Sequence, residues 1–213
     1  MRARDGFDPD GARTPLPEAR TDRALGVFIE YGLTDRATLR FKGDWQRGRD
    51  AFVDYEGRGP VEIGLSWRAW SDARNTVGLY GGYSQAGEGR NAGYAAPGAG
   101  EHDWEARLAY GRDLGSRLGA ASFVEVEAAR RLRDGLPDET RVDATLGARR
   151  GDWLALAQAY AGAADGGARW LSLEASVTRD FGRWSLQAGW RRTAAGREAP
   201  ISEGPMFAVW RRF

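Results

Sequence analysis

Cysteine is absent from this 213-residue chain, and histidine occurs once. The lack of cysteine excludes disulfide frameworks and thiolate metal sites. The 31 basic and 30 acidic residues nearly cancel, so the chain has no overall field to attract nucleic acid, and we expect no nucleic-acid partner. Long apolar runs are missing too, because no window approaches the roughly 20 apolar residues that a membrane-spanning helix needs.

Alternation of apolar and polar residues is what the sequence does contain. It recurs with a period of two from about residue 24 to the last residue, in eleven segments. In the clearest one, Leu39 and Phe41 fall on one face while Arg40 and Lys42 fall on the other. Each segment is therefore expected to be a β-strand with one apolar face.

Two segments leave the choice between strand and helix open. Residues 121–131 alternate, but their alanines and glutamates also suit a helix. Residues 153–161 are equally ambiguous, because Gln158 interrupts either face. Both lie where the repeat requires a strand, and we read them as strands on that ground.

The connections between the segments alternate in length. Short ones occur near residues 33–36, 71–75, 113–116, 150–152 and 180–183, and longer ones rich in Gly, Pro and charge lie between them. Short turns on one rim and long loops on the other are typical of an up-and-down transmembrane β-barrel. We therefore predict an all-β antiparallel barrel of eleven strands over residues 24–213, with residues 1–23 as a loop remnant or disordered N-terminus.

Aromatic residues gather near the ends of the expected strands, where an amphipathic ring suits the headgroup level of a membrane. The alternative is the core of an ordinary β-sandwich. The predicted membrane-interface aromatics are Tyr31, Trp45, Trp67, Trp104, Tyr110, Trp184 and Trp190.

The C-terminus resembles the assembly signal of Gram-negative outer-membrane proteins. Phe207, Val209 and Phe213 share one face of the last segment, although Arg211 stands where that signal usually has an apolar residue. The run Glu30–Arg36 is also similar to the strand and tight periplasmic turn of such proteins. The resemblance implies the cell outer membrane as location, with its lipid, lipopolysaccharide and assembly machinery as partners.

Chain polarity adds a further expectation. If the last strand ends in the periplasm, the first of eleven strands runs inward and residues 1–23 are extracellular. Bacterial barrels have an even number of strands, and residues 1–6 contain no apolar stretch of a secretory signal. We therefore expect a twelve-stranded parent whose signal peptide and first strand precede Met1.

The polar faces of the strands carry sixteen charged residues, eight acidic and eight basic when Glu30, Arg149 and Arg212 are included, and we expect them to alternate around the barrel. Such a ladder either holds a closed lumen together by ion pairs or lines a hydrated passage. The predicted pore-lining residues are Arg40, Lys42, Asp44, Glu62, Arg68, Glu105, Arg107, Glu125, Glu127, Arg141, Asp143, Glu174 and Arg191.

Catalysis is not expected. The single histidine, His102, is flanked by Glu101 and Asp103, but neighbours on a strand point to opposite faces. No serine motif accompanies it for a triad. We predict no catalytic residue, no metal and no cofactor.

The leading hypothesis is an outer-membrane channel or transporter for small polar solutes. Alternatives are a non-conducting structural or adhesion barrel that acts through its extracellular loops, a lipid-modifying barrel enzyme, and a soluble lipocalin-like barrel. The last would bury the apolar face and expose the charges.

Overall fold

The computed structural model of the chain describes residues 1–51, 54–88 and 99–213, and it is built of antiparallel strands. Among these residues, no helix is long and apolar enough to span a membrane. The strands are β1 (Arg2–Phe7), β2 (Arg13–Gly32), β3 (Ala37–Arg49), β4 (Asp54–Ser71), β5 (Asn75–Gln85), β6 (His102–Arg117), β7 (Ala120–Arg133), β8 (Glu139–Arg150), β9 (Trp153–Ala164), β10 (Arg169–Phe181), β11 (Trp184–Arg197), β12 (Ala199–Pro200) and β13 (Glu203–Arg211).

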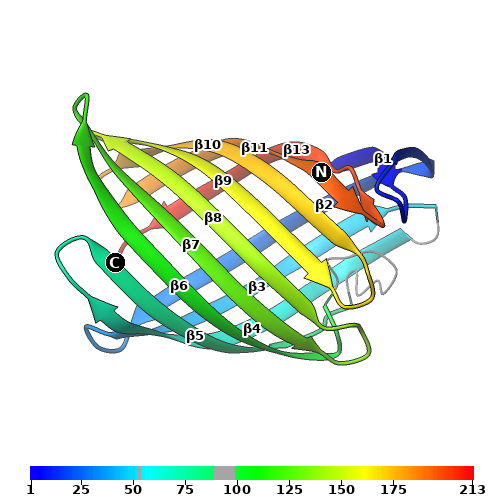
Figure 1. Cartoon of the computed structure of the whole chain (residues 1–213), viewed down its shortest axis with the longest axis horizontal. Helices are drawn as coiled ribbons and strands as arrows, with labels where there is room; N and C mark the ends of the chain where they lie inside the picture. The colour runs from blue at the N-terminus through cyan, green and yellow to red at the C-terminus, as the bar shows by residue number, and fades with distance from the viewer. Residues whose placement is uncertain (52–53, 89–98) are drawn as a thin grey trace.

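The strands form one closed antiparallel barrel (Figure 1). From β2 to β11 each strand pairs with its neighbours in the chain, as an up-and-down topology requires, and β13 follows β11. The short strand β1 closes the ring, because it pairs with β2 on one side and with β12 and β13 on the other. The predicted fold class is confirmed, while the strand count of eleven is wrong by the two short strands β1 and β12.

Closure is confined to one end of the barrel. β1 reaches β2 between Arg13 and Thr21. Beyond Arg23, β2 pairs only with β3 among the described residues, and β13 beyond Glu203 pairs only with β11. On the lumen side of this seam the rings of Phe28 and Trp210 meet edge-on, with their centroids 6.4 Å apart.

Apolar side chains cover the outside of the barrel. Leu65 and Leu173 are 45% and 49% exposed, whereas Glu174, the next residue of β10, is only 4% exposed. A soluble barrel would show the opposite arrangement, with the apolar face packed inside. The lipocalin-like alternative is therefore wrong, and the exposed apolar belt is the surface that lipid covers.

The N-terminal prediction needs correction. Residues 1–23, expected to be loop or disordered, contain β1 and the first part of β2. Pro15 and Pro17, residues common in loops, here lie at alternate positions of an extended strand that pairs with β1. The expectation that a further strand precedes Met1 concerns residues outside this chain, and it stays a prediction.

The two ambiguous segments are strands. Residues 121–131 lie within β7 and residues 153–161 within β9, each paired on both sides. Strands also extend further than expected: β6 continues to Arg117, and β3 to Arg49. Several residues predicted to be in loops therefore belong to strands. Charged residues outside the lipid can continue the backbone hydrogen bonding between strands as well as apolar residues can.

Candidate functional site

All thirteen predicted pore-lining residues lie on the inner face of the barrel. Residues paired across two strands point to the same face of the sheet. Lys42 is paired with Glu62 and Glu174 with Arg191, so both members of each pair point to the inner face. The register extends this orientation to Arg40, Asp44, Arg68, Glu105, Arg107, Glu125, Glu127, Arg141 and Asp143.

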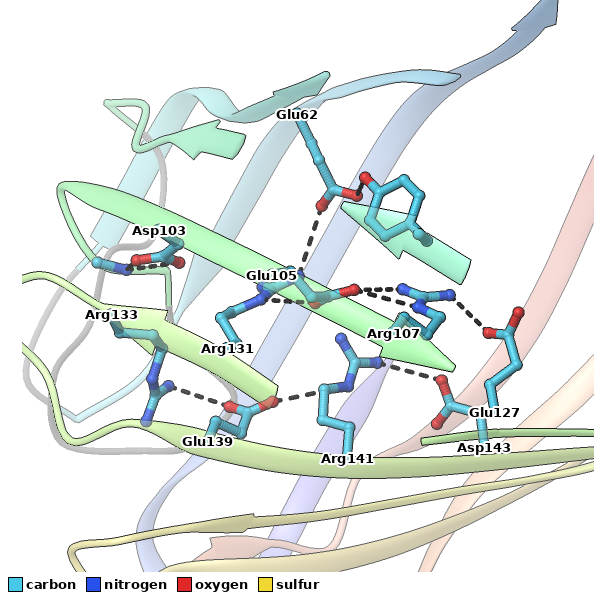
Figure 2. Close-up of polar contacts among 12 residues, drawn as sticks. Glu62, Asp103, Glu105, Arg107, Glu127, Arg131, Arg133, Glu139, Arg141 and Asp143 are labelled. Atoms are coloured by element: carbon cyan, nitrogen blue, oxygen red, sulfur yellow. Dashed lines mark hydrogen bonds and ion pairs between the residues drawn. The ribbon is translucent and has the colours of Figure 1, made fainter. Parts of the chain in front are cut away.

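The central feature of the lumen is a cluster of ion pairs around Glu105 of β6 (Figure 2). Its carboxylate lies 2.6 Å from Arg107 and 2.7 Å from Arg131 of β7, and only 3% of the side chain is exposed. Arg107 also contacts Glu127 at 2.6 Å, and Arg131 contacts Glu62 at 3.4 Å. The cluster thus ties the inner faces of β4, β6 and β7 together by charge-assisted hydrogen bonds.

Tyr80 of β5 fills the space between these strands. Its hydroxyl donates a hydrogen bond of 2.7 Å to Glu62, and the Arg107 guanidinium lies 5.2 Å from the ring centroid. The inner-face neighbours Gly64 and Gly82 make room for the ring, because a Cβ at either position would overlap it. Glycine is required at these two positions by packing against an aromatic ring.

A second set of charges stands beside the first, towards the long-loop end of β7 and β8. Glu139 is 1% exposed and lies 3.1 Å from Arg133 and 3.6 Å from Arg141. Arg141 in turn lies 3.8 Å from Asp143 (Figure 2). Arg133 also donates from Nε to the carbonyl oxygen of Pro137 at 2.7 Å, which fixes the β7–β8 loop to the mouth of the lumen.

Sequence reasoning missed four members of these clusters. Arg131, Arg133 and Glu139 fell in or next to the expected 132–140 loop, although Arg131 and Arg133 continue the alternation that begins at Glu125. Tyr80 was missed because the space that Gly64 of β4 and Gly82 of its own strand leave for its ring can be recognised only once the strands are paired. The signal for the arginines was present in the sequence as an unbroken period of two.

Charge is unevenly distributed around the lumen, which corrects the expectation that it alternates regularly. The inner charges are concentrated on β3, β4, β6, β7 and β8. On the opposite wall Glu174 and Arg191 form a pair at 2.7 Å, and most other inner side chains there are neutral. The neutral inner residues of β10, β11 and β13 include Ser172, Ser176, Thr178, Gln187, Thr193, Met206, Ala208 and Trp210.

The lumen is not filled along its whole length. Lys42 and Glu125 lie on the inner face in the middle of their strands, and both side chains are nevertheless exposed to water. Glu125 forms no ion pair or hydrogen bond with the described residues. Open space therefore lies beside these two side chains, between the charged wall and its opposite.

The predicted interface aromatics all project from the outer face. Their exposed fractions lie between 39% for Tyr110 and 65% for Tyr31, as expected for rings that no protein covers. Whether each ring lies at the headgroup level stays a prediction. The rings are those of Tyr31, Trp45, Trp67, Trp104, Tyr110, Trp184 and Trp190.

The C-terminal residues also lie on this outer surface. Phe207 and Val209 project outward from β13 and Phe213 is almost fully exposed. Arg211, the departure from the assembly signal, shares their face and lies over the rings of Trp184 and Phe213, at 5.1 and 4.9 Å from the centroids. A cation held over aromatic rings can occupy an interfacial position.

His102 lies at the start of β6, on the outer side of the barrel at its long-loop end. Its ring stacks on Tyr83, whose hydroxyl lies 2.6 Å from Nδ1. Within the part of the chain that the structure describes, no group of three or more His, Cys, Asp or Glu side chains could hold a metal ion. Several inner-face carboxylates, among them Glu105, Glu139 and Glu174, are paired with arginines.

No protein-family model matches this chain, and no curated protein matches it. Among solved structures, the COG4313 outer membrane channel from Pseudomonas putida F1 is similar, with 15% identity and a TM-score of 0.63 over 98% of this chain and 90% of that one. OmpT, an outer membrane protein of Vibrio cholerae in its trimer form, aligns over 99% of this chain and 96% of that one with 11% identity. Its TM-score of 0.37 is too low to indicate a shared fold. At such identities the first likeness shows the fold alone.

Proposed function

We propose that this outer-membrane β-barrel of Gram-negative type is a channel that lets small polar solutes cross through its hydrated lumen. The observation that carries the proposal is the exposure to water of Lys42 and Glu125, two charged side chains in the middle of the inner face. A lumen closed by packing would leave neither of them accessible. We also propose that the barrel sits in the lipid of the outer membrane next to lipopolysaccharide, a proposal that its exposed apolar belt supports, and that it is inserted by the assembly machinery that reads its C-terminus.

Charge asymmetry supports selection within such a channel. Arginines and carboxylates crowd one wall, while small neutral side chains line the other, so a transverse field acts on a passing solute. Polar solutes with local charge gain most from such a field, whereas apolar solutes gain nothing. No catalytic step and no cofactor enters the proposal.

Electrical recording of the refolded chain in planar bilayers tests the proposal. We expect stepwise conductance in potassium chloride, and we expect Glu125→Gln to shift the reversal potential in a salt gradient towards anions. The matched control is Glu56→Gln, which removes the same charge from an exposed position at the long-loop end. Absence of conductance, or equal shifts for both variants, would contradict a passage through the lumen.

A non-conducting structural barrel is the second candidate, and the buried cluster around Glu105 favours it. Several guanidinium groups and carboxylates fill part of the lumen and join neighbouring strands. In such a barrel the exposed charges would face a closed, water-filled chamber. Uptake of a small sugar into liposomes separates the candidates, because only a channel admits it.

A further inference from the structure

A cavity of about 270 Å³ opens at the short-turn end of the lumen, where the β2–β3 turn meets the inner faces of β3 to β6. Its floor includes Tyr80 and Arg107, so it lies below the central ion-pair cluster. Its lining includes three further arginines, Arg36, Arg40 and Arg68. This volume lies just below the range of roughly 300–1,000 Å³ for small-molecule sites, so it suits a ligand of few atoms.

One buried polar atom in this lining has no partner among the described residues. It is the hydroxyl oxygen of Ser66. The Arg40 Nε, in contrast, lies 2.9 Å from the Glu30 carboxylate and is paired with it. Buried polar groups are normally paired, so the unpaired Ser66 hydroxyl marks a place that a polar ligand can satisfy.

Arg68 supplies the charge for that ligand. Among the described residues, its side chain donates a hydrogen bond to the backbone carbonyl of Asp35, and no carboxylate lies within ion-pair distance of it. In contrast, Arg107 is held by Glu105 and Glu127. The free guanidinium edge of Arg68 therefore faces the cavity with its charge unmatched.

We propose that this cavity is a binding site for a small monocarboxylate, with Arg68 as its main anchor and Ser66 as a second donor. The planar guanidinium can donate two parallel hydrogen bonds to the two oxygens of a carboxylate. Glu127 and Asp35 also line the cavity, and they disfavour a ligand of higher negative charge. The proposal rests on the channel function above and deepens it, because it names the class of solute that pauses at this end of the lumen.

Line broadening of ¹³C-labelled acetate by the detergent-solubilised full chain tests the site. We expect broadening with the wild-type chain, competition by unlabelled acetate, and a reduction of at least fivefold in Arg68→Gln. Ser66→Ala should give a smaller reduction. The matched control is Arg112→Gln, at the same end of the barrel but on the opposite face of the wall, and it should behave as the wild type.

Three results would overturn the site: no broadening with the wild-type chain, equal loss in both arginine variants, or inorganic phosphate that competes as well as acetate. The last would indicate general attraction of anions. Chloride conductance separates this inference from the channel proposal. Conductance without Arg68-dependent acetate binding refutes the site alone, and Arg68-dependent binding without conductance refutes the channel alone.

Discussion

Replacement of Glu105 by glutamine would test the central ion-pair cluster most directly. The variant keeps the shape of the side chain and removes a charge that is 97% covered and shared between Arg107 and Arg131. Removing one partner of a buried pair costs about 3–5 kcal/mol. We expect the lower end, about 3 kcal/mol, because each arginine keeps a second carboxylate, Glu127 at 2.6 Å and Glu62 at 3.4 Å.

Urea unfolding of the refolded barrel in detergent micelles, followed by tryptophan fluorescence, measures this loss as a fall in the free energy of unfolding. Glu56→Gln is the control, because its pair with Arg47 is exposed on both sides and such pairs contribute about 0–1 kcal/mol. The glutamine variant should also shift ion selectivity towards anions. If Glu105→Gln costs no more than Glu56→Gln, the cluster is solvated in the barrel and does not join its strands.

Three further predictions concern packing, the lipid-facing surface and a turn. Gly82→Val should lower the folded fraction, measured as heat-modifiable gel mobility, because the Tyr80 ring occupies the place where a Cβ at position 82 would lie. Gly81→Val should fold normally, because no atom lies within 4 Å of a Cβ at position 81. Equal folded fractions of the two variants would refute the packing role. Leu65→Arg, on the exposed apolar belt, should destabilise the barrel in lipid bilayers by about 2–4 kcal/mol in equilibrium unfolding, and an unchanged free energy would place this residue outside the hydrocarbon. In the β4–β5 turn, hydrogen bonds from the N–H groups two and three residues after Asp72 lower the pKa of its carboxyl group. The carboxylate therefore stabilises the fold fully above the pKa of the unfolded chain, and this contribution is lost as the pH falls through the pKa of the folded chain. The difference in unfolding free energy between wild type and Asp72→Ala should shrink below about pH 4, and a pH-independent difference would refute this.

The barrel was predictable from the sequence because its two faces contact different media. Outer residues such as Leu39 and Phe41 must suit lipid and inner residues such as Arg40 must suit water, so every strand carries the period of two. The same rule placed all thirteen predicted pore-lining residues on the inner face.

Strand ends and inner packing were not predictable in the same way. Beyond the lipid both faces of a strand are wet, so the alternation fades and the ends of β2 and β3 looked like loops. The cluster around Glu105 joins residues from strands that are distant in sequence, and the pairing of Arg131 with Glu62 across 69 positions follows only from barrel closure. The unpaired Arg68 likewise became apparent only when its neighbours were placed.

The position of β1 has a mechanical consequence. Backbone hydrogen bonds run around the full circumference only where Arg2–Phe7 bridges β2 to β12 and β13. At the other rim, among the described residues, the aromatic contact of Phe28 with Trp210 spans the same interval without such bonds. We therefore expect the long-loop rim to keep its diameter and changes in diameter to occur mainly at the short-turn rim, near the cavity that Arg68 lines.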